Sequence, residues 1–513
     1  MATARSSSRN SAFEVCVWLY PVSSVVKNSC PYSSSRHLPP ATRFSHTEIL
    51  KPQSRPPKPQ CSPARSAAFE ILLRVEREAS YAAELLHSAA YETFSTADHG
   101  LATELVMGVL RWRSALDREI AQTSSQAVSK LDLEVLTALR LALYQLRRLD
   151  RIPPRAAIHE SVELVKQARK RSAAPFVNAV LRKLAPAAPL PHASASDQEN
   201  SASPEALAHA FAHPLWLVER WVREYGRAAA HQICQHDQSV PATAIRLRDP
   251  AAENDLRAEG IELTPGAMLR SARRVQTANI AKARALRAGQ AVIQDEASQL
   301  VAALVGRGSR ILDCCAAPGG KTLAMADGNP GATMAAVELH PHRARLLQKL
   351  LCAAQSSHSA RRHNIQVITA DVQTAPLPAN FDRVLADVPC SGTGTLARNP
   401  EIKWRLQPAD LEDLQARQVA IFRSALTQLA PGGRLIYSTC SLEKEENEDV
   451  IEKSMEENST FRLLDIRPEL DRLKSEGVLT WPDIASLARG PFLRTLPGIH
   501  PCDGFFAAIF EKQ

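Results

Sequence analysis

The chain has no long apolar run. None of its 513 residues lies in a stretch approaching the roughly 20 apolar residues of a membrane-spanning helix, so we expect no membrane partner. Cysteine is also sparse: the ten cysteines are scattered and form no CxxC pair and no Cys/His cluster at zinc spacing. This pattern excludes a disulfide framework and predicts free thiols and no bound metal.

The glycine motifs of two common nucleotide sites are missing as well. Gly320-Lys321-Thr322 ends like a P-loop, but the residue five positions before Gly320, which would have to be glycine, is Cys315. A dinucleotide-binding GxGxxG is also absent. A ligand that enters at the Gly319-Gly320 turn is therefore expected to lack a triphosphate.

Acidic residues are nearly absent from the first sixty positions, where only Glu14 and Glu48 occur among many Ser, Arg and Pro residues. Such a segment cannot bury enough apolar surface to fold alone, and its composition is typical of an organellar transit peptide. We expect residues 1–62 to be that peptide, directed to the chloroplast, with the mitochondrion as the alternative. The alternative to a transit peptide is a disordered basic tail.

The remaining chain divides by its hydrophobic pattern. Residues 63–186 carry apolar side chains at three- and four-residue spacing, which predicts an all-helical domain. A Pro/Ala/Ser linker follows at 187–204, and then a helix pair and short alternating runs that predict a small α+β module at 205–288. The net charge of +8 and the pI near 9.0 favour a polyanionic partner, although this alone is a weak signal.

From residue 289 to 513 short apolar runs alternate with helical segments. This predicts an α/β domain with a doubly wound, mostly parallel sheet, whose ligands sit at the carboxyl ends of the strands. The candidate strands are 309–316, 332–339, 365–372, 381–389 and 432–440.

Three carboxylates stand at successive ends of these runs: Glu338, Asp371 and Asp387. Each alone would more often be a loop or helix-cap residue. Together, beside a glycine turn, they fit a nucleoside-bearing cofactor, with Glu338 on ribose hydroxyls and Asp371 near an adenine amino group.

Two cysteines, Cys390 and Cys440, also follow strands of this sheet, each in a turn of small residues. A lone cysteine there is usually a core residue, but two at one edge are a candidate catalytic pair. With a methyl-donating cofactor they suit methylation of cytosine C5, which needs a thiolate on C6, a group that holds N3 and N4, and a helper for elimination. Asp387 can hold the amino group. Position alone does not say which cysteine attacks.

The motifs DCCAAPGGKT, ADVPCSGTGT with RNPEIKW, YSTCS and HPCDGFFAAIF resemble those of the Nol/Nop/Sun family of RNA cytosine-5 methyltransferases, which includes the RsmB-type enzymes. The resemblance implies S-adenosylmethionine as cofactor, Cys440 as nucleophile and Cys390 as the residue that assists product release. Glu338 stands where the family more often has Asp. The implied cofactor contacts are Cys315, Ala316, Ala317, Pro318, Gly319, Gly320, Lys321, Glu338, Asp371 and Asp387. For Arg398, Lys403 and Trp404, in and beside the IKW element, we expect RNA contacts.

The helical segment 63–186 resembles the NusB-like domain of RsmB-type enzymes, which implies RNA binding and favours small-subunit ribosomal RNA as substrate. Its basic residues could contact phosphates or simply form a solvated face.

The acidic run 443–449 is expected to be only the first turn of a helix. A tRNA methyltransferase, or a ribosome assembly factor with secondary or lost catalysis, remains the alternative. We expect a monomer, and the target nucleotide is not predicted. The basic residues of segment 63–186 that could contact phosphates are Arg140, Arg147, Arg148, Arg169, Lys170 and Arg171.

Overall fold

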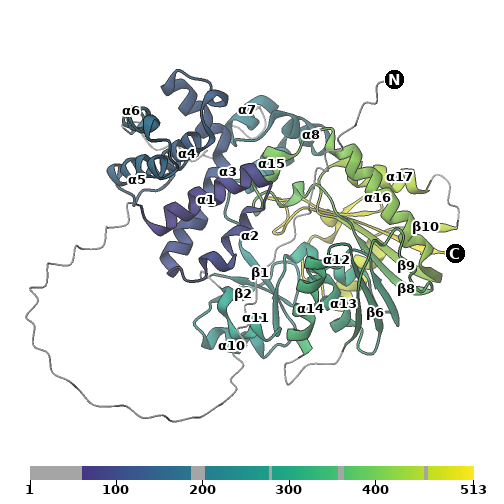
Figure 1. Ribbon diagram of the computed structural model, residues 1–513. Helices are drawn as coiled ribbons and strands as arrows, with labels where there is room; N and C mark the ends of the chain where they lie inside the picture. The colour runs from purple at the N-terminus through teal and green to yellow at the C-terminus, as the bar shows by residue number, and fades with distance from the viewer. Residues whose placement is uncertain (1–60, 186–202, 277–279, 356–362, 456–459) are drawn as a thin grey trace, which may run out of the picture.

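A bundle of helices, a small antiparallel sheet and a large helix-covered sheet lie against one another in the protein (Figure 1). The computed structural model describes residues 61–185, 203–276, 280–355, 363–455 and 460–513. Within these ranges no helix is both long and apolar enough to cross a membrane. All but the last two residues of the expected transit peptide, and most of the expected linker, lie outside the described residues.

The helical bundle forms where the apolar spacing predicted it. One face of each long helix is buried in a shared core, as with Leu105, Leu139 and Val177, which are all fully buried. The helices are α1 (Pro63–Glu78), α2 (Ala82–Leu86), α3 (Thr96–Ser124), α4 (Leu133–Arg148), α5 (Pro154–Gln167) and α6 (Ala174–Leu184).

Residues 205–288 do not share one core. Helices α7 (Pro204–Ala210), α8 (Leu215–Tyr225) and α9 (Arg227–Asp237) pack against Leu396, Ile402 and other apolar residues of the C-terminal part. A separate core lies under the small sheet, whose order is β2-β3-β1-β4. The boundary predicted at 288/289 cuts through this sheet, because β4 pairs with β1. The elements are β1 (Thr243–Leu247), α10 (Ala252–Ala258), β2 (Leu263–Pro265), β3 (Ala272–Val275), α11 (Arg284–Arg287) and β4 (Ala291–Ile293).

The large sheet confirms the predicted fold class. Its strands run in the order β11-β12-β13-β9-β8-β5-β6-β7, and β9-β8-β5-β6-β7 are mutually parallel. Helices cover both faces, α12, α13 and α14 on one and α16 and α17 on the other (Figure 1). The parallel strands are β5 (Arg310–Asp313), β6 (Thr333–Glu338), β7 (Asn364–Thr369), β8 (Phe381–Asp387) and β9 (Leu429–Thr439). The helices are α12 (Glu296–Leu304), α13 (Gly320–Gly328), α14 (Pro341–Gln355), α15 (Ile402–Arg405), α16 (Asp410–Thr427), α17 (Glu448–Met455) and α18 (Arg467–Ser475).

An antiparallel extension beyond β9 was not predicted. Strand β13 (Phe505–Lys512) pairs with β9 and carries β12 (Phe492–Thr495) and β10 (Phe461–Leu464), while β11 (Ala488–Arg489) pairs with β12. Because β13 is buried on both faces, its sequence shows no alternation of apolar and polar residues. It closes the side of the sheet next to Cys440.

Candidate active site

The turn after β5 forms one wall of a cavity of about 250 Å³ at the carboxyl ends of the parallel strands. Gly319 has a φ of 111°, and a Cβ there would lie 2.6 Å from the Leu347 side chain, so the turn requires glycine. Helix α13 begins at the next residue and directs its first N–H groups toward the turn. This wall can hold a ligand against backbone.

Asp313, which was not singled out from the sequence, lies behind this turn. Its carboxylate is 1% exposed and accepts a 2.7 Å hydrogen bond from the Thr322 hydroxyl. The other oxygen, Oδ1, has no hydrogen-bond partner among the described residues although Asp313 lines the cavity. Burial raises the pKa of Asp313 to about 7, far above that of an ordinary aspartate. A buried carboxyl with a vacant oxygen at a cavity wall fits a polar ligand.

The three carboxylates predicted from the strand ends all line the cavity. Glu338, at the end of β6, accepts from the backbone N–H groups of Ala317 (3.3 Å) and His340 (3.0 Å). Asp371 follows β7 and accepts from the N–H of Gln373 at 2.9 Å. The predicted turn residues from Cys315 to Lys321 line it too, so the structure gathers every residue that the sequence assigned to the cofactor.

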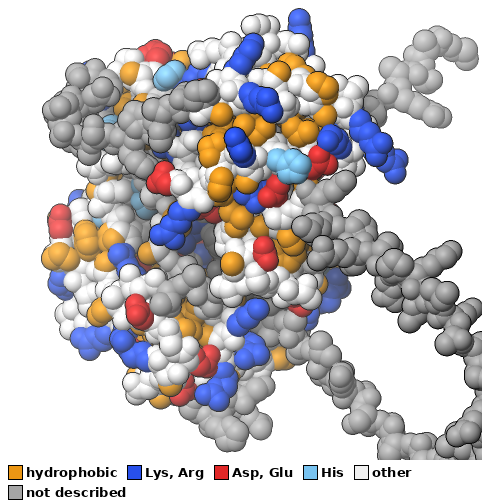
Figure 2. All heavy atoms as spheres, turned by 90° about the vertical axis from the view of Figure 1, so that its left-hand side faces the viewer, with side chains coloured by type: hydrophobic (Ala, Val, Ile, Leu, Met, Phe, Trp, Pro, Cys, Tyr) orange, Lys and Arg blue, Asp and Glu red, His pale blue; other side chains and the backbone are white. Residues whose placement is uncertain are grey.

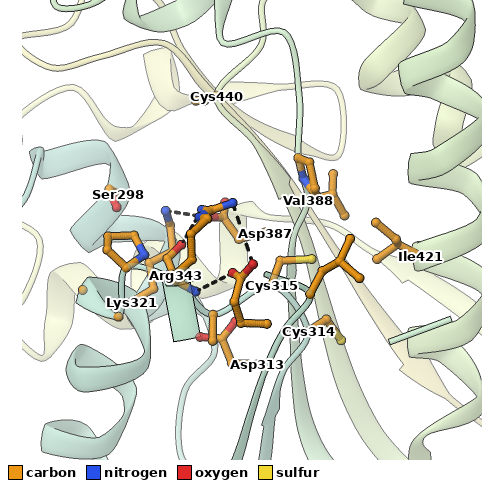
Figure 3. A pocket seen from close by; sticks show the side chains of 18 of the residues that line it. Ser298, Asp313, Cys314, Cys315, Lys321, Arg343, Asp387, Val388, Ile421 and Cys440 are labelled. Atoms are coloured by element: carbon orange, nitrogen blue, oxygen red, sulfur yellow. Dashed lines mark hydrogen bonds and ion pairs between the residues drawn. The ribbon is translucent and has the colours of Figure 1, made fainter. Parts of the chain in front are cut away.

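Asp387, at the end of β8, stands between two donors. Lys321 Nζ lies 2.7 Å from Asp387 Oδ2 (Figure 3), and the Ser438 hydroxyl donates to Oδ1 at 2.7 Å. Burial opposes the charge of Lys321, but the carboxylate outweighs it, and the pKa of Lys321 is raised. The ammonium also lies 5.0 Å from the Phe505 ring centroid. Lys321 is thus a cation that Asp387 holds at the cavity wall.

The two cysteines are in contact, with Cys390 Sγ 3.3 Å from Cys440 Sγ. Cys440 is half-buried and lines the cavity, whereas Cys390 is 5% exposed and lies behind it. The contact with Cys440, and then burial, raise the pKa of the Cys390 thiol. At neutral pH Cys390 is therefore a thiol that can donate its hydrogen to the Cys440 sulfur.

The acidic run 443–449 is more than a helix start, which corrects the expectation from the sequence. Glu443 is 2% exposed and accepts from Arg220 and from the Trp221 indole at 3.1 Å. Glu446 is fully buried and accepts from Ser391 and Ser441, the residues that follow the two cysteines. Helix α17 begins only at Glu448.

Comparison with known proteins finds a matching family for the helical bundle and another for the domain with the large sheet. The family model "16S rRNA methyltransferase RsmB/F" matches residues 304–511, and the NusB family model matches residues 62–186. A "Probable ribosomal RNA small subunit methyltransferase B" of Bacillus subtilis (strain 168) is 32% identical over 88% of this chain and 98% of that protein. The chain belongs to the RsmB/F family. It is an RNA methyltransferase.

Further relatives agree with this assignment. A "Probable ribosomal RNA small subunit methyltransferase B" of Synechocystis sp. is 31% identical over 88% of this chain and 99% of that protein. Among solved structures, PH0851 superposes with a TM-score of 0.70 at 21% identity and covers 90% of this chain and 100% of its own, which supports the fold. The family resemblance seen in the sequence is confirmed.

In this RsmB/F family member the expected RNA contact of Lys403 is wrong. Lys403 is 1% exposed, and its Nζ donates to the backbone oxygen of Arg111 in α3 at 3.0 Å. Trp404 is half-buried and donates its indole N–H to Leu110 O at 2.6 Å. Both side chains therefore fasten α15 to the helical bundle. The sequence pattern IKW does not distinguish an exposed cation from one at a domain contact.

Arg398 is also engaged within the protein. Its Nε lies 2.9 Å from Asp503 Oδ1, and one terminal nitrogen lies 3.3 Å from Asp295 Oδ2. Asp295 and Asp503 line the cavity, so Arg398 supports its wall from behind. An RNA contact for Arg398 stays a prediction.

The basic residues predicted on the helical bundle fall into three groups. Arg140 and Arg147 are buried and paired with Asp117 and Glu119, which excludes them as free phosphate contacts. The guanidinium carbon of Arg148 lies 3.6 Å from the centroid of the Trp112 ring. The others, Arg169, Lys170 and Arg171, lie between α5 and α6, where Lys170 pairs with Asp132 at 2.9 Å. On the face that Figure 2 shows, basic side chains are scattered among apolar ones.

Further cavity residues were missed by sequence reasoning. Arg343 donates to Ala317 O at 3.1 Å, Leu339 is 55% exposed at the cavity, and Phe505 lies beside Lys321. No local sequence pattern identifies these three residues, because each is brought to the cavity by an element next to the strand ends and not by a motif of its own. In the described ranges, no group of three or more His, Cys, Asp or Glu could hold a metal ion.

Proposed function

We propose that this enzyme methylates C5 of a cytosine in small-subunit ribosomal RNA with S-adenosylmethionine as methyl donor. The observation that carries the proposal is the contact of Cys440 Sγ, at the cavity, with Cys390 Sγ behind it. The relatives named ribosomal RNA small subunit methyltransferase B support the choice of RNA.

The cavity fits the cofactor on its own chemistry. The vacant oxygen of buried Asp313 and the glycine-only turn at Gly319 call for a polar ligand held against backbone. Glu338 would hold the ribose hydroxyls, and Asp371 would accept from the adenine amino group. When bound, S-adenosylmethionine supplies an electrophilic methyl group on a sulfonium sulfur.

Cys440 would be the nucleophile, because of the two cysteines in contact it is the one that lines the cavity. The target base has to leave its stack to enter. Addition of the Cys440 thiolate to C6 makes C5 electron-rich, as in other covalent catalysis. The Cys390 thiol, 3.3 Å away, can stabilise the thiolate by donating to it.

Asp387 and Lys321 would orient the cytosine. The Asp387 carboxylate can accept from the base's N4 amino group while Lys321 and Ser438 hold it in place. Lys321, held at the cavity by Asp387, would lower the energy of negative charge that develops on the ring during attack.

Cys390 would act in the second half of the cycle. Once the Cys440 sulfur is bonded to C6, it no longer carries a charge that the Cys390 thiol has to stabilise. Cys390 can then give its proton to water and take the proton from methylated C5. The C6–S bond breaks as the C5–C6 double bond reforms, and Cys440 is released as a thiolate.

The test is to incubate the purified protein with S-adenosylmethionine and either a small-subunit ribosomal RNA or a tRNA pool, and to map 5-methylcytosine by bisulfite sequencing. We expect a protected cytosine in the ribosomal RNA that is lost in Cys440→Ala. Methylation of tRNA alone would contradict the substrate. No methylation with ribosomal RNA still bound would favour an assembly factor.

We further propose that the protein acts in the chloroplast, because of the Ser-, Arg- and Pro-rich composition of residues 1–62. A fluorescent protein fused to these residues should enter plastids, and mitochondrial fluorescence would contradict this. We also propose a monomer, which light scattering would test.

A further inference from the structure

We infer that Glu446 is a positioning residue that holds the two cysteine-bearing turns of the active site at their working separation. The side chain is fully buried, does not line the cavity, and has its hydrogen bonds to the neighbours of the cysteines. The inference rests on the proposed roles of Cys390 and Cys440, because it explains why their sulfurs meet.

One carboxylate receives hydrogen bonds from both turns. Glu446 Oε1 accepts from the Ser391 backbone N–H at 2.7 Å, and Oε2 accepts from the Ser391 hydroxyl. Oε2 also accepts from the Ser441 hydroxyl. Ser391 directly follows Cys390 and Ser441 directly follows Cys440, so Glu446 ties each cysteine to the other through its neighbour.

A third element completes the arrangement. Gln418 of α16 donates one amide group both to Glu446 Oε1 at 2.9 Å and to Pro389 O at 2.8 Å. Pro389 directly precedes Cys390, so the Cys390 turn is held on both sides. The Tyr437 hydroxyl donates to the Glu446 backbone oxygen at 2.7 Å, which fixes the position of Glu446 relative to β9.

The site requires acceptors at this position. The Ser391 N–H and the Gln418 amide can only donate to Glu446, and the two serine hydroxyls also donate to it. An alanine would remove all of these acceptors and break the link between the two turns. No cation approaches Glu446 among the contacts described, so a role in an ion pair does not explain its burial.

The first readout is the rate at which the two sulfurs form a disulfide, which depends on the distance between them. Diamide takes two hydrogens from a pair of thiols as the sulfur–sulfur bond forms, and is reduced to the hydrazine. The full-length protein should form a Cys390–Cys440 disulfide rapidly, and peptide mass spectrometry should show the linked pair with the loss of two hydrogens. In Glu446→Ala we expect this rate to fall about tenfold or more, because misplacement by about 1 Å costs up to about 100-fold.

The second readout is turnover. Glu446→Ala should lower kcat by about the same factor while the affinity for S-adenosylmethionine stays unchanged, because Glu446 is not at the cavity. Glu445→Ala is the matched control: the half-buried side chain of Glu445 pairs with Arg220 and should change neither rate.

Ser391→Ala and Ser441→Ala test the same link with a smaller change, and they provide the test if Glu446→Ala does not fold. Each should slow disulfide formation, and neither should add its full effect to that of Glu446→Ala. A folded Glu446→Ala protein with the wild-type disulfide rate would overturn the inference, as would serine variants that leave this rate unchanged. The disulfide assay uses neither RNA nor cofactor, so its result is independent of the proposed methylation.

Discussion

Replacing Asp313 by asparagine should stabilise the protein at alkaline pH. The wild-type carboxyl is 1% exposed, and burial raises its pKa to about 7. Asparagine has the same shape, can still accept from the Thr322 hydroxyl, and carries no charge to bury.

The sign and size of the change in the free energy of unfolding follow from proton linkage. An unfolded aspartate has a pKa of about 3.9, so between about pH 4 and 7 the folded state binds more protons than the unfolded state, and wild-type stability falls as pH rises. With a folded pKa of about 7, ionisation costs the wild type about 2 kcal/mol at pH 5.5 and about 4 kcal/mol at pH 8.5, as upper limits. Asp313→Asn should therefore gain about 2 kcal/mol more at pH 8.5 than at pH 5.5.

The assay is the thermal midpoint of wild type and Asp313→Asn at both pH values. For a domain of this size about 1 kcal/mol corresponds to about 2–4 °C, so the advantage of the variant should grow by about 4–8 °C from pH 5.5 to 8.5. Thr322→Val, which removes the partner hydroxyl and keeps the carboxyl, should show no such gain. A variant advantage that is absent, or that shrinks with pH, would refute the assignment of a buried, hard-to-ionise carboxyl.

Two further substitutions test the cavity wall and the domain contact. Gly319→Ala should lower stability by about 1–3 kcal/mol and weaken S-adenosylmethionine binding measured by calorimetry, because φ is 111° and a Cβ would meet Leu347; wild-type affinity would contradict the proposed cradle. Lys403→Met should leave the affinity for ribosomal RNA within about twofold and the salt dependence of binding unchanged, because a lysine bound to phosphate contributes about one unit of slope. A lower slope would show that the ammonium leaves Arg111 to contact RNA.

The parallel part of the fold and the cavity were predictable because a strand end is a local feature. Glu338, Asp371 and Asp387 each close an apolar run, and parallel strands bring such ends to one edge of a sheet. The antiparallel extension was not predictable in this way. Strand β13 is apolar on both faces and no helix separates it from β12, so neither period nor alternation marks it.

The errors about charged residues share one physical cause. Lys403 and Glu446 are buried by parts of the chain far away in sequence, and their hydrogen-bond partners, Arg111 and Ser391, lie about 290 and 55 residues away. A charge run is usually a solvated surface, and nothing local distinguishes the exception. Lys403 was therefore assigned to RNA and Glu446 to a helix terminus.

The central claim is that Cys440 attacks the base and Cys390 permits its release. It is tested most directly by incubating Cys390→Ala with S-adenosylmethionine and small-subunit ribosomal RNA and looking for an adduct that survives denaturation. The account predicts an RNA–protein adduct in Cys390→Ala that is absent from Cys440→Ala and from the double variant. An adduct formed by Cys440→Ala instead would reverse the two roles and contradict the account.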